Sequence, residues 1–351
     1  MRLYYYYRKI NQAKRAKWVF KLLLTHLKKK EPFSEKTISY FKKSIDDVLK
    51  SLTIIQKRKS KENYFFHFKK QLSDLVLKPV ARQWQTSKIW HKRYTATLCY
   101  AHGFDKDDEN NLIVLLNDPS ALIAVNVAKI IIECSPKLVQ EVITTFAKKR
   151  RLQQTLFLEN IKFFNQNIST LVLERLENEQ VLYTKIFCYR LLSEFPQETI
   201  SNCVGRDLNH DSIDMKIAIL KYLKRCKGSE RNELIYGLAV DPSWEIRAAA
   251  AKVLGDINTD TSLEILTSFL VSKDWWVRRN AAYSLYLLGE KGIAVLKDQS
   301  PKKDKFAYET ALSILIEKDK FVYQTALAMV QGTDKMADEP ASTVLKEKDN
   351  S

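Results

Sequence analysis

The sequence predicts an all-α protein, a right-handed α-solenoid of about seven to eight helical pairs with a basic helical segment at its N-terminus. Gly and Pro number only 8 each, which leaves little room for a β architecture. Seven residues recur at spacings of 31, 30, 31, 31, 31 and 31, namely Ala96, Val127, Phe157, Cys188, Ile219, Ala250 and Ala281. Each is followed four positions later by a large apolar or aromatic residue, namely Tyr100, Ile131, Ile161, Leu192, Leu223, Leu254 and Leu285. This spacing marks one face of a helix, and a unit of this size buries that face only by stacking on its neighbours.

Charge divides the chain into two regions. Residues 1–80 contain 21 Lys or Arg and 6 Asp or Glu, a net +15 of the total +17, whereas the remaining residues contain 37 and 35. A basic segment of this kind favours polyanions, either nucleic acid or the anionic face of a membrane. We therefore expect a basic aromatic helix over residues 1–30, a basic helical segment over 31–80 that packs on the start of the solenoid, the solenoid over 81–331, and a disordered tail over 332–351.

The first thirty residues resemble the cytoplasmic edge of a membrane-anchored helix. They combine aromatic residues suited to headgroup depth, such as Trp18, with many cations. The cations expected to bind an anionic surface are Arg8, Lys9, Lys14, Arg15, Lys17, Lys21, Lys28, Lys29 and Lys30. The sequence has no run of about 18 apolar residues. We expect a place at the cytoplasmic face of the inner membrane, with the helix either lying on the surface or preceded by a spanning segment upstream of Met1.

Two further helices are expected before the repeats. Glu31 and Pro32 break the first helix, and Ser34 caps the second. The apolar stripe of this second helix consists of Ile38, Phe41, Ile45, Val48, Leu49 and Leu52. The same apolar spacing predicts a third helix from about Asn63 to Leu77.

The best-preserved repeat runs from Asp241 to Gly255. We expect the Asp241 side chain to accept from N–H groups at the helix start, Pro242 to occupy the first helical position, and Gly255 to supply a left-handed stop. The small residues Ala250 and Ala251 allow close approach of the neighbouring helix.

These residues resemble the short bacterial HEAT-like repeats, whose pattern reads D-P-x-x-x-(V/I)-R-x-x-A-A-x-x-L-G. The matching positions of this repeat are Ile246, Arg247, Ala250, Ala251, Leu254 and Gly255, and those of the next are Val277, Arg278, Ala281, Ala282 and Leu285. Earlier units keep the apolar positions but replace the Arg with Lys216, Lys185, Gln154 and Ala124. The resemblance implies an α-solenoid of HEAT-like helical pairs.

One repeat position carries a cation in five of the units and therefore forms a column, made by Arg93, Lys185, Lys216, Arg247 and Arg278. The column could follow a chain of phosphates. Alternatively, each cation pairs with a turn carboxylate such as Asp211, Asp241 or Asp274 and locks neighbouring units together. We favour this second interpretation, a structural ladder, because structural ion pairs are common.

Three tryptophans lie in the two best-preserved repeats, at Trp244, Trp275 and Trp276. Packing between repeats is the expected role, because Trp is highly buried on average. Adjacent residues of one helix start cannot both point inward, however, so Trp275 or Trp276 must point outward. With Arg279, the tryptophans are the candidates for binding a partner.

Signatures of chemistry are missing from the sequence. The five histidines are scattered, no Cys/His cluster has metal-ligand spacing, and there is no phosphate-binding or nucleophile motif. Asp207 to Asp214 imitates a calcium loop, but Ser212 and Ala218 stand where that loop needs Gly and a bidentate Glu. The five cysteines are odd in number and favour a reducing compartment. We expect no cofactor, no metal and no small-molecule substrate.

These observations favour a non-catalytic protein-binding scaffold, held at a membrane by its basic N-terminus, whose partner is another protein and could itself be membrane-bound. One alternative is a nucleic-acid-binding protein resembling the HEAT-like DNA glycosylases, which work with an Asp and tryptophans on a basic face. Asp274, Trp275, Trp276 and Arg278 fit that combination, but the repeats are nearly neutral. Another alternative is a protein similar to the phycobilin lyases, which leaves the basic segment without a role.

The end of the repeat array carries a short duplication. Phe306, Tyr308 and Thr310 recur fifteen residues later as Phe321, Tyr323 and Thr325. Two matched helices that close the stack are the expected result.

Overall fold

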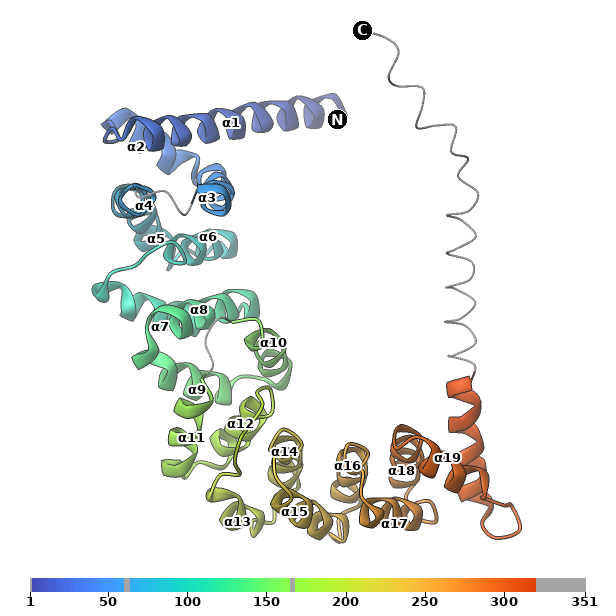
Figure 1. The fold of residues 1–351 in the computed structure, drawn as a ribbon. Coiled ribbons are helices and arrows are strands. Elements are labelled where there is room, and N and C mark those ends of the chain that lie inside the picture. The colour runs from blue at the N-terminus through green and yellow to red at the C-terminus, as the bar shows by residue number, and fades with distance from the viewer. Residues whose placement is uncertain (1, 60–63, 165–167, 320–351) are drawn as a thin grey trace, which may run out of the picture. The chain divides into compact units, whose positions relative to one another are not determined.

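The computed structural model describes residues 2–59, 64–164 and 168–319, with side chains over 12–58, 64–164 and 168–319. The side chains of Arg8 and Lys9, the second copy of the terminal duplication and the expected tail lie outside the described residues. Every regular element within them is a helix, and the single β-bridge found there, between Gln197 and Cys226, is isolated. The predicted all-α, helical-repeat fold is therefore confirmed for this part of the chain (Figure 1).

Seven helices carry the 31-residue period, and we call them the column helices. Each begins three residues before the column position, so the repeat in sequence is a repeat in structure. They are α6 (Trp90–Tyr100), α8 (Ala121–Cys134), α10 (Arg151–Ile161), α12 (Leu182–Leu192), α14 (Ile213–Leu223), α16 (Trp244–Leu254) and α18 (Trp275–Leu287).

The helices that precede and follow the column helices complete the pairs. They are α5 (Lys78–Trp84), α7 (Glu109–Leu116), α9 (Val139–Lys148), α11 (Ser169–Asn178), α13 (Cys203–Leu208), α15 (Glu230–Ala239), α17 (Asp260–Phe269) and α19 (Glu290–Lys297). Short 3₁₀ turns at Lys106–Asp108 (η2) and Pro136–Leu138 (η3) lead into α7 and α9. Residues 305–319 form one more helix as far as the structure describes it.

The chain forms two compact units, residues 1–195 and 196–351. In each unit the periodic positions make the core. Val127, Phe157, Cys188, Ile219 and Ala250 are fully buried, because the column helices pack on one another and on their partner helices, as α14, α16 and α18 do in the second unit (Figure 1).

The N-terminal segment forms more helices than expected. α1 (Arg2–Lys29) ends before Glu31, and Ser34 caps α2 (Glu35–Lys43) by accepting from the Thr37 N–H at 3.3 Å, both as predicted. The predicted second helix is wrong as a single element. The chain leaves the helical conformation at Ser44, with φ −114° and ψ 31°, and α3 (Ile45–Lys59) begins there.

The predicted third helix extends further than its apolar stripe. α4 (Phe65–Leu72) continues through a π-helical turn, η1 (Ser73–Leu77), directly into α5. Widening the helix by one residue in a π turn shifts the faces of the two flanking helices relative to each other. The continuous helix thereby connects the basic segment to the first repeat.

Two expectations about the repeat ends are corrected. Pro242 precedes the first residue of α16, Trp244, by two positions, and the Asp241 carboxylate accepts from the N–H of Ser243, the residue before the helix, at 2.9 Å. Gly255 is right-handed, with φ −61°. A Cβ at Gly255 would come 2.7 Å from Ser284 Oγ and 2.9 Å from Ser284 Cβ. The absence of a side chain at Gly255 therefore allows α18 to approach α16 closely, and it does not serve a left-handed turn.

Candidate functional site

The first turn of every column helix exposes a large apolar side chain. Four of these residues are the first of their helix, namely Trp90, Ile213, Trp244 and Trp275. Four others are the second residue of their helix, namely Leu122, Leu152, Tyr183 and Trp276. Single exposed apolar residues are ordinary on a protein surface, and here they recur in the first turn of each repeat's column helix. We call these side chains the first-turn apolar residues.

The three predicted partner-binding tryptophans all belong to this set. Trp244, Trp275 and Trp276 are 38%, 48% and 51% exposed. The expectation that packing between repeats buries them is not met, because each of the three side chains is more than one-third exposed. Trp275 and Trp276 meet edge to face with ring centroids 4.5 Å apart.

Trp244 and Trp276 line a groove of about 460 Å³ along α14, α16 and α18. Ala248 and Ala249 leave room between the rings, and Ile217 and Leu220 add apolar surface from α14. The base is fixed by the amide of Asn280, which donates to the Ala248 carbonyl across the two helices at 2.8 Å. Two half-exposed indoles around an apolar base on a rigid frame are typical of a protein-binding hot spot.

The groove has a cationic border. Lys221 and Lys252 occupy the same repeat position on α14 and α16, and Lys224 pairs with Asp256 at 2.6 Å. Glu245 also lines the groove, and a hydrogen bond from the Ser243 hydroxyl lowers its pKa. A second hollow, of about 280 Å³, lies at the same repeat positions between α8 and α10, where Lys129 takes the place of Lys221.

The column position forms ion pairs between successive repeats. Arg93 reaches Asp118 at 2.6 Å, Lys216 reaches Asp241 at 2.8 Å, and Arg247 reaches Asp274 at 2.8 Å. Burial by itself would raise the pKa of Asp241, but hydrogen bonds from Lys216 and the Ser243 N–H lower it.

The same side chains also hold the loop in front of their own helix. Nη1 of Arg247 donates to the carbonyls of Asp241 and Pro242 at 2.7 and 2.8 Å, and Nη1 of Arg93 donates to those of Ser87 and Lys88. Gln154, at the column position of α10, reproduces this with its amide, which donates to the carbonyls of Ala147 and Lys149.

The geometry at the column position is therefore structural. Lys185 is buried at this position in α12. Asp274, which the comparison with DNA glycosylases singles out, accepts from Arg247 and precedes α18.

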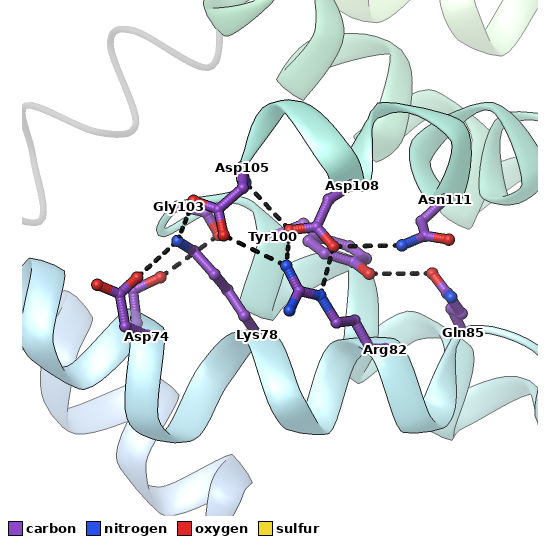
Figure 2. Close-up of polar contacts among 10 residues, drawn as sticks. Asp74, Lys78, Arg82, Gln85, Tyr100, Gly103, Asp105, Asp108 and Asn111 are labelled. Atoms are coloured by element: carbon purple, nitrogen blue, oxygen red, sulfur yellow. Dashed lines mark hydrogen bonds and ion pairs between the residues drawn. The ribbon is translucent and has the colours of Figure 1, made fainter.

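A dense polar network joins α5 to the loop before α7 (Figure 2). Lys78 lies between Asp74 and Asp105, 2.6 Å from each. Arg82 donates to both carboxylate oxygens of Asp108 at 2.7 and 2.9 Å. Burial alone would lower the pKa of Lys78, but the hydrogen bonds to Asp105 and Asp74 raise it. The network crosses residue 80 and ties the basic segment to the first repeats.

The predicted surface-binding cations of α1 fall into two groups. Arg15 pairs with the buried carboxylate of Asp47 at 2.5 Å, and Lys29 lies 3.9 Å from Glu31. The remaining described cations, Lys14, Lys17, Lys21, Lys28 and Lys30, are exposed. The apolar side of the same helix is occupied, because Val19, Leu23 and Leu27 are buried where α1 packs on α3.

The described residues lack two kinds of feature, a membrane-spanning helix and a metal-binding cluster. None of the helices there combines the length and the apolar character that crossing a bilayer requires. The described His, Cys, Asp and Glu side chains form no group of three or more that could hold a metal ion.

Sequence reasoning missed two parts of the site. The groove lysines Lys221 and Lys252 share a repeat position, so aligning the units could have found them. The network of Lys78, Arg82, Asp105 and Asp108 left no such signal, because its residues lie outside the repeating positions.

Residues 231–315 match the family described as HEAT repeats, so this part of the chain consists of HEAT-like repeats. None of the curated proteins compared with the chain matches it. Among solved structures, human deoxyhypusine hydroxylase in complex with glycerol is similar at 14% identity, over 72% of this chain and 97% of that one, with a TM-score of 0.29. A structure from work on tubulin recruitment and assembly by microtubule polymerases with tumor overexpressed gene (TOG) domain arrays is similar at 10% identity, over 84% of this chain and 96% of that one, also with a TM-score of 0.29.

Proposed function

We propose that the protein is a non-catalytic scaffold that binds another protein through the groove between Trp244 and Trp276. The observation that carries the proposal is the recurrence of first-turn apolar residues, two of which are tryptophans that line this groove. Indoles supply much contact area at low entropic cost, and lysines at the border favour a partner with acidic residues around an apolar anchor.

Site-specific photo-crosslinking in cells tests this binding surface. A benzophenone amino acid at Trp276 is expected to give one discrete protein adduct, and the same residue at Glu264, on the outward part of α17, serves as the control. Trp244→Ala should remove most of the adduct formed at Trp276, since loss of a hot-spot Trp costs about 2 kcal/mol or more of binding. Equal adducts from Trp276 and Glu264, or an adduct unaffected by Trp244→Ala, would contradict the proposal.

The basic N-terminus is proposed to hold this scaffold at the cytoplasmic face of a membrane. The support is electrostatic, because α1 packs its apolar side on α3 and turns Lys14, Lys17, Lys21 and Lys28 to solvent. Each cation near an anionic surface contributes about 1 kcal/mol, so four are sufficient for reversible association. The half-exposed Trp18, edge to face with Tyr40, adds an aromatic group of the kind found at headgroup depth.

Flotation with vesicles of phosphatidylcholine and phosphatidylserine tests the attachment. Replacing Lys14, Lys17, Lys21 and Lys28 by Gln should release the protein from the vesicles at moderate salt. The matched control replaces four exposed lysines elsewhere, Lys106, Lys148, Lys273 and Lys302, and should leave flotation nearly unchanged. If both variants lose vesicle binding equally, the protein binds through its overall net charge and not through the lysines of α1, which would contradict the proposal.

Nucleic-acid binding is the alternative that the same basic segment supports. A gel shift with random duplex and single-stranded DNA separates the two, since both kinds of binding weaken with salt. Retention on DNA without retention on anionic vesicles would replace the membrane proposal.

A further inference from the structure

The last column helix breaks the pattern of ion pairs. Arg278 keeps the loop contacts of its equivalents, because its Nη1 donates to the carbonyls of Ser272 and Lys273 at 2.7 and 3.0 Å. Its Nε, however, has no hydrogen-bond partner among the described residues, although the residue is only 8% exposed. Arg93 uses that same Nε to donate to Asp118 at 2.6 Å.

The chain that follows does not supply the missing carboxylate. The spacing from cation to partner is 25 residues for Arg93 and Lys216 and 27 for Arg247. The corresponding stretch after Arg278 contains Asp304, whose carboxylate accepts from the Ala307 N–H at 2.7 Å but does not reach the Nε of Arg278. The same stretch places the ring of Phe306 over the guanidinium, with 5.2 Å between the ring centroid and Cζ of Arg278, while the Nε stays unpaired.

A cavity of about 340 Å³ lies beside this guanidinium. Its lining includes Trp275, Phe306, Thr310 and Ser313, which offer two aromatic walls and two hydroxyl groups. Glu309 also lines the cavity, and its carboxylate lies 4.0 Å from Lys305 without pairing with Arg278. An unpaired buried donor costs free energy, and an incoming acceptor recovers it.

We propose that this cavity, the Arg278 pocket, binds an acidic side chain or C-terminal carboxylate of a partner polypeptide, which completes the ladder in place of the next repeat's aspartate. The chemistry follows from the three equivalent pairs, in all of which the acceptor is an aspartate carboxylate on a chain turn. Trp276 lines the neighbouring groove and Trp275 lines the Arg278 pocket, so the same aromatic pair borders both. The inference extends the proposed function in naming a polypeptide as the source of the carboxylate.

Nuclear magnetic resonance of the full chain with ¹⁵N-labelled arginine tests the pocket directly. The probe is the blocked dipeptide acetyl-leucyl-aspartyl amide, and its asparaginyl counterpart is the control. We expect the aspartyl peptide to cause a saturable shift of the Arg278 Nε–H resonance. The asparaginyl peptide should bind roughly tenfold to a hundredfold more weakly, which is the difference that a charged hydrogen bond makes. The Nε–H resonances of Arg93 and Arg247, whose carboxylates are in place, should stay unchanged.

One variant sharpens the experiment. Glu309→Gln removes the acidic group from the Arg278 pocket and should tighten the peptide severalfold. No shift at Arg278, an equal shift with the asparaginyl peptide, or a shift with inorganic phosphate alone would each overturn the proposal. Because the probe is a free peptide, this outcome is independent of whether the Trp244–Trp276 groove binds a partner.

Discussion

At the scale of single residues, Asp108 shows why the polar network of the first repeats is a matter of stability. Its side chain is 1% exposed and receives two hydrogen bonds from Arg82, one from Asn111 and one from the Asp105 N–H. Burial alone would raise the pKa of Asp108, but these bonds lower it, so the carboxylate remains charged in the folded protein. A buried charge is stable only with such partners.

Arg82→Ala is therefore expected to destabilise the unit that contains residues 1–195. The loss should be about 2 to 3 kcal/mol, below the full cost of breaking a buried pair because Asn111 and the Asp105 N–H remain. Urea unfolding of the full chain measures it. Lys162→Ala is the control, since its pair with Glu159 is exposed and should contribute less than about 1 kcal/mol. Equal effects of the two substitutions would contradict this account of the network.

His102 makes the stability of the same unit depend on pH. Burial, with the positive charge of Lys69 nearby, lowers the pKa of His102 to about 4. The unfolded chain has an imidazole pKa of about 6.5 and therefore binds a proton between these two values that the folded chain does not. Stability should fall as pH falls from about 6.5 to 4, by at most about 3 kcal/mol.

Urea unfolding between pH 7.5 and 5 tests this dependence, and His102→Gln should flatten the slope. In Lys69→Met the imidazole should titrate at higher pH than in the natural chain, because one repelling charge is gone. If the unfolding free energy depends on pH with the same slope in the natural chain and in His102→Gln, another group causes the loss of stability at low pH.

At the scale of elements, the existence and spacing of the column helices were predictable from the sequence. Their apolar positions recur locally, four residues apart within each helix and about 31 between helices, so the pattern needs no knowledge of the tertiary structure. The break at Ser44 and the π turn of η1 were not predictable in this way. The apolar stripe runs through both, and the bends depend on contacts with segments distant in sequence, such as those of η1 with α2 and α6.

The candidate site was predictable in part. The sequence predicts Trp244, Trp275 and Trp276 as possible contacts, but the exposed fraction of each side chain depends on tertiary packing. The unpaired Arg278 was not predictable, because Asp304 stands at nearly the expected spacing and only the structure shows its carboxylate turned to the Ala307 N–H. The composition and the period of the sequence thus locate the helices. Which cation pairs with which carboxylate about 25 residues later can be known only from the three-dimensional structure.

The contact between α16 and α18 gives a prediction for glycine. Gly255→Ala places a Cβ within 3.2 Å of Ser284 Cα as well as its side chain, so the two helices must separate. We expect a loss of about 1 to 3 kcal/mol, as for overpacking of a core. Gly237→Ala is the matched control, because nothing lies within 4 Å of its Cβ in α15, and it should stabilise by about 0.5 to 1 kcal/mol.

Chemical unfolding of both glycine variants decides the point. Ser284→Gly in the Gly255→Ala background removes the atoms that clash and should recover part of the loss. A neutral Gly255→Ala would mean that α18 shifts without cost, and the close approach would then have no energetic role.

At the scale of the whole molecule, charge and packing are organised separately. The excess of positive charge lies in residues 1–80, while apolar burial divides at residues 195 and 196 into two compact units. The basic segment therefore belongs to the same compact unit as the first four column helices. A change in its charges should act on surface association, whereas a change in either core should act on unfolding.

Two compact units predict two unfolding transitions. Each has its own buried core, and repeat arrays lose two-state behaviour when their parts differ in stability. Differential scanning calorimetry of the full chain should show Arg82→Ala lowering one Tm and Gly255→Ala lowering the other, each by about 5 °C for a unit of this size. In each variant, the transition of the unit that carries no substitution should keep its Tm and provides the internal control. A single transition that both substitutions lower equally would show that the seven repeats unfold as one cooperative body, and stability effects would then spread along the ladder from one repeat to the next.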